Sequence, residues 1–110
     1  MSFSDRTEKL VNDLIQAEYK SACEQFGEKY NSIHEGYAVL LEEVEEAEHC
    51  IKQARDKLDY IWTCIKLNRM ETVKCFIDSL NTSTKDTTKE LAQVGAVLMK
   101  IKNTIGEVKE

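Results

Sequence analysis

The residues best suited to chemistry lie in one acidic run, Leu41-Glu42-Glu43-Val44-Glu45-Glu46. Glu43 and Glu46 are three residues apart and Glu42 and Glu46 are four apart, so a helix brings the three carboxylates toward one face. Like charges at this spacing repel by about a few tenths of a kcal/mol in water. A divalent cation bound by the carboxylates turns this repulsion into a net attraction, because hard cations prefer several carboxylate oxygens. The spacing therefore predicts a cation site, and a solvated acidic helix face is the alternative.

Two stretches of the sequence resemble a known enzyme family. The first is Ser32-Ile33-His34-Glu35-Gly36-Tyr37-Ala38-Val39-Leu40-Leu41-Glu42-Glu43, and the second is Lys89-Glu90-Leu91-Ala92-Gln93-Val94-Gly95-Ala96. They are similar to the two motifs of MazG-like, all-α nucleoside triphosphate pyrophosphohydrolases, above all the small members of phages and prophages. The resemblance covers roughly Ser32 to Lys100. In that family two acidic helices hold magnesium, and the ion holds the triphosphate of a nucleotide that is cleaved to monophosphate and pyrophosphate.

The resemblance implies a set of Mg²⁺ ligands in this chain. Glu42, Glu43 and Glu46 would be the ligands of the first motif helix and Glu90 the ligand of the second. The family's second motif is Glu-x-x-Asp, whereas here Gln93 stands in the place of the aspartate. Glutamine keeps an acceptor oxygen but lacks the charge, so it is a weaker ligand for Mg²⁺. We therefore expect a nucleotide-binding protein that sequesters a nucleotide or nucleotide signal or hydrolyses it weakly, and an active pyrophosphohydrolase is the alternative.

Further side chains are candidates for contact with the nucleotide, and they are His34, Tyr37, Lys85, Lys89 and Gln93. His34 lies in the first turn of a predicted helix, where it could touch a phosphate or face water. Tyr37 could stack on a base, although its place in an apolar stripe favours packing. Lys85 and Lys89 precede Glu90 and could meet a phosphate, or they could simply be solvated.

Three stretches have the helical spacing of apolar residues that would position these side chains. The predicted helices run from about Asp5 to Phe26, from Ile33 to about Lys66, and from near Arg69 to Gly106. Ser32 and Glu35 form a capping-box pattern at the second helix start, and Asn68 suits a left-handed stop. In the second helix, an apolar stripe is expected to face the core or an interface, with Trp62 on the same side; it consists of Tyr37, Leu41, Val44, Ile51, Leu58 and Ile65.

The third stretch leaves two readings open. The polar run Asn81-Thr82-Ser83-Thr84 could break it, with a restart at a second capping box formed by Thr87 and Glu90. Against a break, apolar or threonine residues stay in seven-residue phase across the gap, at Val73, Leu80, Thr87, Val94 and Ile101. The sequence alone does not decide between one helix and two.

Composition narrows the function classes. The chain has 110 residues, 42% of them hydrophobic, 32% charged and none proline, and its net charge is −5. These values predict a single domain over residues 1–110, which the helical periodicity predicts to be all-α and the resemblance implies to be MazG-like. The negative charge argues against duplex nucleic acid as a partner, because that binding needs a basic face. No apolar run approaches the roughly 18 residues of a membrane helix, and no secretory signal is recognised. We therefore expect a cytoplasmic location, which would be the host cytoplasm if the chain is encoded by a phage. The four cysteines lack zinc spacing and are expected to be reduced.

The length of the second predicted helix indicates association. A helix from Ile33 to Lys66 is about 50 Å long at 1.5 Å per residue, whereas a compact chain of this length has a radius of gyration of about 13 Å. Part of its apolar stripe would overhang one copy, so we expect an elongated bundle of three to four helices, MazG-like and assembled as a homo-oligomer, either dimer or tetramer. A rival from another class is a non-enzymatic helical inhibitor or scaffold that acts on a protein partner through its acidic face.

Overall fold

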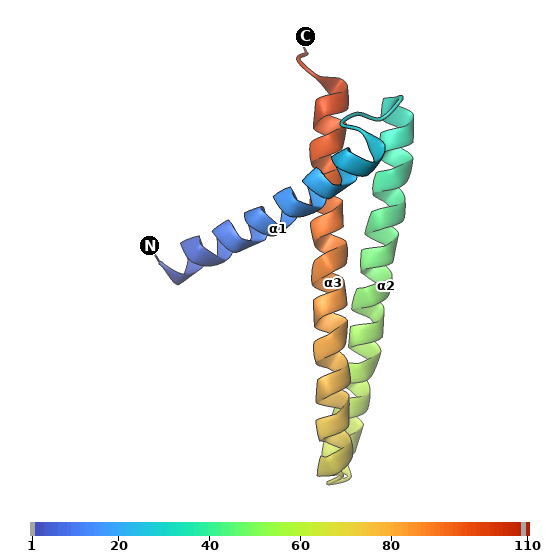
Figure 1. The fold of residues 1–110 in the computed structure, drawn as a ribbon. Helices are drawn as coiled ribbons and strands as arrows, with labels where there is room; N and C mark the ends of the chain where they lie inside the picture. Colours follow the sequence, from blue (N-terminus) through green and yellow to red (C-terminus); the bar gives the residue numbers. More distant parts are fainter. Residues whose placement is uncertain (1, 109) are drawn as a thin grey trace. The chain divides into compact units, whose positions relative to one another are not determined.

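Three α-helices make up the fold. The computed structural model describes residues 2–108 and 110, and within them it contains α1 (Phe3–Phe26), α2 (Ile33–Lys66) and α3 (Met70–Ile105) and no strand (Figure 1). The all-α prediction is therefore confirmed, with a count of three. Internal contacts divide the chain into two compact units: residues up to Val44 together with those from Leu91 onward form the first, and residues 45–90 form the second.

The helix ends follow local side-chain chemistry. Ser2 caps α1 in a full capping box with Asp5, because each side chain bonds to the other residue's backbone N–H. Ser32 caps α2 as predicted, since its Oγ accepts a hydrogen bond from the Glu35 backbone N–H at 3.1 Å. Asn68, the predicted stop, has a φ of 55° and separates α2 from α3. Asparagine tolerates this left-handed conformation better than most residues.

α3 is one continuous helix, so the predicted alternative start at Thr87 does not occur. The reason lies in the threonines of the polar stretch. Their hydroxyls donate to the carbonyl oxygens four residues earlier: Thr82 to Asp78, Thr84 to Leu80, Thr87 to Ser83, and Thr88 to Thr84. Because each hydroxyl is satisfied on its own helix, the polar run does not break the helix.

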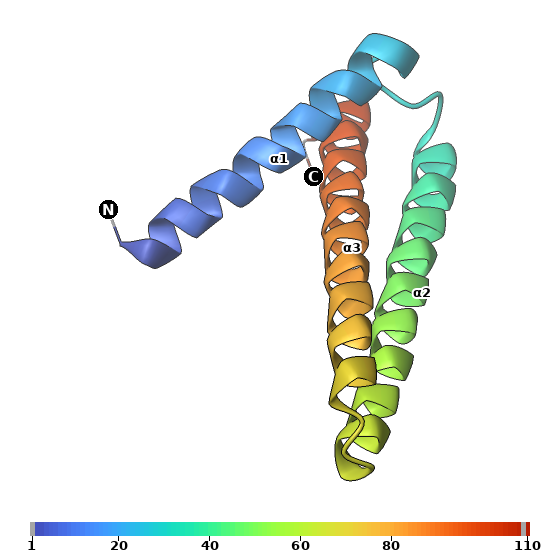
Figure 2. The same ribbon diagram turned by 60° about the horizontal axis from the view of Figure 1, so that its bottom comes forward.

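In the second unit, α2 and α3 lie side by side and antiparallel (Figures 1 and 2). Ile61, Cys64 and Val73 form the buried cluster between them, and Phe76 packs against it. The core also has a polar part, because the Lys57 Nζ donates to the Ser83 Oγ at 2.6 Å and to the Ser79 carbonyl oxygen at 3.3 Å. Ser83 is 6% exposed. Thus the hairpin holds a lysine–serine hydrogen bond beside its apolar residues, with Ser83 buried and Lys57 partly buried.

In the first unit, small residues allow close helix packing. α1 crosses α3 at Gly95, where an added Cβ would lie 2.9–3.0 Å from three side-chain carbons of Ile15 (Figure 2). Likewise, a Cβ at Gly36 would lie 3.0 Å from carbons of Tyr30 and Ile101. A Cβ at Gly95 would require Ile15 to shift, and a Cβ at Gly36 would leave little room, so glycine suits the close approach at both positions.

The apolar stripe predicted for α2 faces outward within this chain. All of its residues are 36–62% exposed: Tyr37, Leu41, Val44, Ile51, Leu58 and Ile65. Trp62 is 59% exposed. Within this chain the stripe therefore does not pack in a core, because α3 packs against a neighbouring face of α2 that carries residues such as Ala47 and Cys64. The interface that was the other expectation for this stripe stays a prediction. Among the described residues, no helix has the length and apolar character of a membrane span.

Candidate functional site

Two carboxyl groups from different helices meet in the second unit. Glu46 on α2 and Glu90 on α3 each offer a carboxylate oxygen, and these oxygens lie within 4.8 Å of each other. Glu46 is exposed and Glu90 is partly buried. The antiparallel pairing of the helices therefore creates a close pair of acids.

The pKa of the Glu90 carboxyl is raised above its ordinary value. Burial is the largest cause, followed by the hydrogen bond with Glu46 and the negative charge of Glu46, and Asp86 adds a smaller effect. All of these disfavour the ionised form of Glu90. A cation placed between the carboxylates would act in the opposite direction, since it favours both ionised forms.

Glu43 extends this carboxylate pair along α2. It precedes Glu46 by one helical turn, and an oxygen of its carboxylate lies within 4.8 Å of one on Glu46. Glu43 is partly buried. The fourth predicted ligand, Glu42, is exposed and is not among the carboxylates that converge. Of the predicted ligand set, the structure thus brings Glu46 and Glu90 together in the second unit, and Glu43 lies one helical turn before Glu46 on α2.

The chemistry of these donors fits Mg²⁺. The cation prefers oxygen ligands in an octahedral arrangement and is often bound by one or two carboxylates, with waters and substrate phosphates in the remaining positions. Glu46 and Glu90 provide the carboxylates from two helices, and Glu43 adds a third one turn away. Among the described residues, no histidine or cysteine belongs to this group of carboxylates, so the group is less suited to softer metals such as Zn²⁺.

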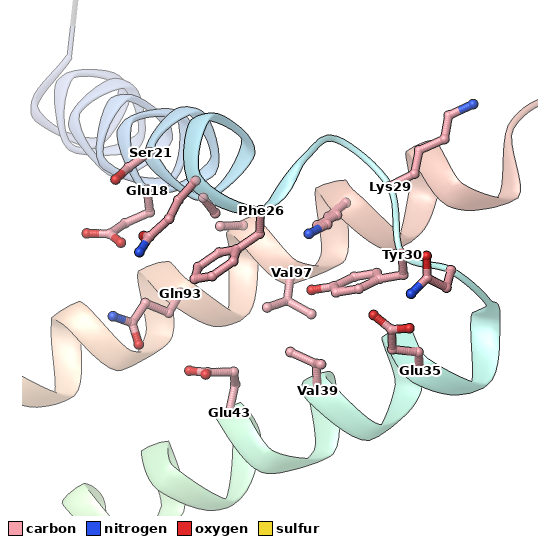
Figure 3. A pocket seen from close by; sticks show the side chains of 15 residues that line it. Glu18, Ser21, Phe26, Lys29, Tyr30, Glu35, Val39, Glu43, Gln93 and Val97 are labelled. Carbon is pink, nitrogen blue, oxygen red and sulfur yellow. The ribbon is translucent and has the colours of Figure 1, made fainter.

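A cavity of about 600 Å³ lies within the first unit (Figure 3). Its size falls in the range of small-molecule sites. Phe26 and Tyr30 provide aromatic surface, while Glu43 and Gln93 reach toward the same space from α2 and α3. Lys100 is also among the lining residues. The cavity therefore combines apolar walls with charged and amide groups, and Glu43 is common to the cavity and the carboxylate run.

Tyr30 and Lys100 form a fixed wall of this cavity. The backbone N–H of Tyr30 donates to the Thr104 Oγ1 at 2.9 Å, and the Lys100 Nζ lies 4.4 Å from the centre of the Tyr30 ring. Lys100 is only 7% exposed. Burial, followed by the negative charges of Glu43 and Glu35, raises the pKa of the Tyr30 hydroxyl, so this hydroxyl stays a hydrogen-bond donor at neutral pH.

The other predicted contact residues are spread over both units. Gln93 lines the cavity. His34 and Tyr37 are exposed in the first unit and do not line it. Lys85 and Lys89 are exposed on α3 in the second unit.

Sequence reasoning missed Lys100 as a cavity residue. A signal was available, because Lys100 follows Gln93 by seven residues and therefore shares its side of α3. Tyr30 could not be placed in this way, since it lies in the linker and its position depends on the contact with Thr104 on α3.

The four cysteines form no disulfide. Cys64 is buried in the hairpin core, and Cys75 is exposed.

Comparisons of the chain with protein-family models, with curated proteins and with solved structures found no match.

Proposed function

We propose that this protein binds a nucleotide through its phosphates, by means of Mg²⁺ held by Glu46 and Glu90, with Glu43 one helical turn before Glu46 on α2. The observation that carries the proposal is the close approach of the Glu46 and Glu90 carboxyl groups from two helices. Two acids this close repel when both are ionised, and a divalent cation that carries a phosphate removes this cost. The resemblance of the two motifs to MazG-like proteins of phage type supports the same assignment.

The cavity of the first unit suits the nucleoside part of such a ligand. Glu43 is one of the residues that line this cavity. Phe26 and Tyr30 offer ring surface on which a base stacks, an interaction worth about 1–3 kcal/mol per base in other proteins. Gln93 and Lys100 provide polar groups that fix its orientation. His34, Tyr37, Lys85 and Lys89 remain secondary candidates for phosphate or base contact.

Binding is favoured over rapid hydrolysis in this proposal. Hydrolysis needs a metal that activates water as well as neutralising phosphate. Gln93 supplies no negative charge at the position where the MazG-like motif has an aspartate, so the metal is held less firmly. The protein then sequesters a nucleotide or nucleotide signal, or cleaves it slowly to monophosphate and pyrophosphate. The proposed setting is the cytoplasm, where nucleoside triphosphates are made and used.

Calorimetric titration with a panel of nucleoside triphosphates, with and without MgCl₂, tests the proposal. The wild-type chain is expected to bind at least one nucleotide only when Mg²⁺ is present, and Glu46→Gln is expected to weaken this binding at least about tenfold, the equivalent of 1.4 kcal/mol. Glu48→Gln is the matched control, because Glu48 is also an exposed glutamate of α2 and lies outside the cluster. Glu48→Gln should bind as the wild type does.

A pyrophosphate-release assay on the same samples separates the two forms of the proposal. Release that Glu46→Gln abolishes identifies an active pyrophosphohydrolase, and Mg²⁺-dependent binding without release identifies a sequestering protein. Uptake of neither nucleotide nor divalent cation contradicts the proposal and favours the non-enzymatic inhibitor or scaffold.

A further inference from the structure

Lys100 brings a buried positive charge to the cavity of the first unit. Among the residues that the structure describes, it is the only charged one that is buried, and it lines the cavity. Its Nζ lies 4.4 Å from the centre of the Tyr30 ring, and no carboxylate of the described residues forms an ion pair with it. A buried ammonium group is costly unless hydrogen-bond acceptors face it. The face of the ring supplies no such acceptor, so Lys100 can donate to an acceptor of a bound molecule.

Lys100 shares one end of the cavity with Tyr30 and Glu35. Glu35 lies in the first turn of α2, and Figure 3 shows its carboxylate beside the Tyr30 ring. Burial, followed by the charges of Glu43 and Glu35, raises the pKa of the Tyr30 hydroxyl, so this group keeps its proton and can donate. This end of the cavity therefore offers two donors, the Lys100 ammonium group and the Tyr30 hydroxyl, and a carboxylate that accepts.

Glu43 and Gln93 lie toward the other end of the cavity. Lys100 follows Gln93 by seven residues on α3, and Glu43 follows Glu35 by eight on α2. About two helical turns, or about 10–12 Å, therefore separate the two ends. In Figure 3 the side chains of Glu43 and Gln93 point toward one another across the cavity. A planar base that lies along this length thus presents its far edge to Lys100 and Glu35.

The acids of the cavity decide which kind of acceptor suits Lys100. Three glutamates line the cavity and outnumber its two lysines; these residues are Glu18, Glu35, Glu43, Lys29 and Lys100. An anionic group of a ligand would meet repulsion from the glutamates, whereas a carbonyl oxygen accepts a hydrogen bond without adding a charge. The Glu35 carboxylate is an acceptor and so suits an N–H of the ligand. The surroundings of Lys100 therefore favour a neutral group in which a carbonyl oxygen stands next to an N–H.

We infer that the cavity selects nucleobases with a ring carbonyl oxygen next to a ring N–H, which are uracil, thymine and guanine. Lys100 donates to the carbonyl oxygen, and Glu35 accepts from the N–H. Adenine and cytosine carry an exocyclic amino group in place of this oxygen. An ammonium group has three donors and no acceptor, so Lys100 cannot form a hydrogen bond with that amino group. The inference rests on the proposed function, because it names the nucleotides that the protein would bind.

Calorimetric titration of the full chain with UTP, CTP, GTP and ATP in MgCl₂ tests the inference. UTP and CTP form one pair, and GTP and ATP form the other. In every pair of which a member binds, the nucleotide with the carbonyl oxygen is expected to bind at least about tenfold more tightly than its amino counterpart. Equal affinities within the pairs, or tighter binding of CTP or ATP, overturn the inference and leave the proposed function standing. Binding of none of the four contradicts the proposed function and the inference with it.

The variant Lys100→Met assigns the preference to its residue. Methionine keeps an unbranched apolar side chain and lacks the charge and the donors, so the preference is expected to fall about tenfold or more while the helical circular dichroism stays unchanged. Lys102→Met is the matched control, because Lys102 is an exposed lysine of α3 that does not line the cavity, and it should keep the wild-type preference. A preference that survives Lys100→Met overturns the inference.

A second measurement on the wild type decides the question if Lys100→Met does not fold. The methylated form of the preferred nucleotide, N3-methyl-UTP or N1-methyl-GTP, keeps the carbonyl oxygen and lacks the neighbouring N–H. It is expected to bind about tenfold more weakly than the parent nucleotide, because the Glu35 carboxylate then has no N–H to accept from. Equal affinities of the methylated and the parent nucleotide overturn the inference.

Discussion

Substituting Glu90 by glutamine is expected to stabilise the protein without divalent cations and to remove its response to Mg²⁺. Glu90→Gln keeps the size and the acceptor oxygen of the side chain and removes the charge that faces Glu46. In the wild type, these two groups lie within 4.8 Å of each other. The variant therefore relieves the repulsion and at the same time removes a proposed ligand of the cation.

The magnitude follows from the separation of the charges. Two like charges 4.8 Å apart repel by about 0.9 kcal/mol at the dielectric constant of water and by about 3.5 kcal/mol at an effective value of 20. Because Glu46 is exposed, the lower figure is the better guide. A gain of about 1 kcal/mol corresponds to a rise in Tm of about 4–8 °C for a chain of this size.

The pH dependence of this gain has a definite sign. The pKa of Glu90 is raised above its ordinary value of 4.5, so its contribution to stability is full below pH 4.5 and is lost as the pH rises through the raised pKa. Glutamine has no such loss. The Tm difference between Glu90→Gln and the wild type should be small below pH 4.5 and reach its full size near neutral pH.

Thermal unfolding followed by circular dichroism, with EDTA or with MgCl₂, measures both effects. At 100 times its dissociation constant, Mg²⁺ should stabilise the wild type by about 2.7 kcal/mol and the Glu90→Gln variant much less. Glu48→Gln serves as the control for a general loss of negative charge. If Glu90→Gln lowers the Tm in EDTA, or if Mg²⁺ raises its Tm as much as that of the wild type, the reasoning about this carboxyl pair is refuted.

Three further substitutions test the packing that positions the site, each by chemical denaturation. Gly95→Ala should destabilise the chain by about 1 kcal/mol although alanine favours helices, because its Cβ would lie too close to Ile15. In an Ile15→Ala background the same substitution should cost nothing, and a stabilised single variant would contradict this close approach. Lys57→Ala should lower the free energy of unfolding by about 1–2 kcal/mol, since it removes the donor to the buried Ser83 hydroxyl. An unchanged free energy of unfolding would show that this hydrogen bond is not formed in solution. Asn68→Ala should lower the free energy of unfolding by about 1 kcal/mol and Asn68→Gly by almost nothing, because Asn68 has a positive φ that glycine adopts without strain. Equal losses in the two variants would argue against a left-handed turn.

Local features of the fold could be predicted from the sequence. Ser32 and Asn68 mark helix ends because their side chains bond to the backbone nearby or tolerate a positive φ, and neither property depends on distant residues. For a related reason, the sequence could not decide whether the polar run in α3 breaks the helix. A threonine such as Thr87 can cap a new helix or bond to the carbonyl four residues earlier, and only the surrounding packing selects the second.

The face of α2 that packs in one chain could not be predicted. Two series run along this helix one residue apart, Glu43-Cys50-Cys64 facing inward and Val44-Ile51-Ile65 facing outward. The more apolar series indicated the core, but α3 pairs with the series that contains Cys50, Lys57 and Cys64. The choice depends on which residues of α3 lie opposite, and periodicity in one helix contains no information about them.

The candidate site was predictable only in part. The spacing of Glu43 and Glu46 was sufficient to place both on one side of α2. Glu90 entered through the motif resemblance, and its approach to Glu46 depends on the antiparallel register of two helices. The wall formed by Tyr30 and Lys100 depends on a contact between the linker and α3, which no local pattern indicates.

Direct binding of a divalent cation is the most decisive measurement for the central claim. Mn²⁺, which can replace Mg²⁺ at carboxylate sites, loses its free-ion electron paramagnetic resonance signal when it binds to a protein. Titration should show bound Mn²⁺ that Mg²⁺ displaces in the wild type, an unchanged result in Glu45→Gln/Glu48→Gln, and loss of binding in Glu46→Gln/Glu90→Gln. Equal Mn²⁺ binding by the two double variants would contradict the assignment of Glu46 and Glu90 as cation ligands.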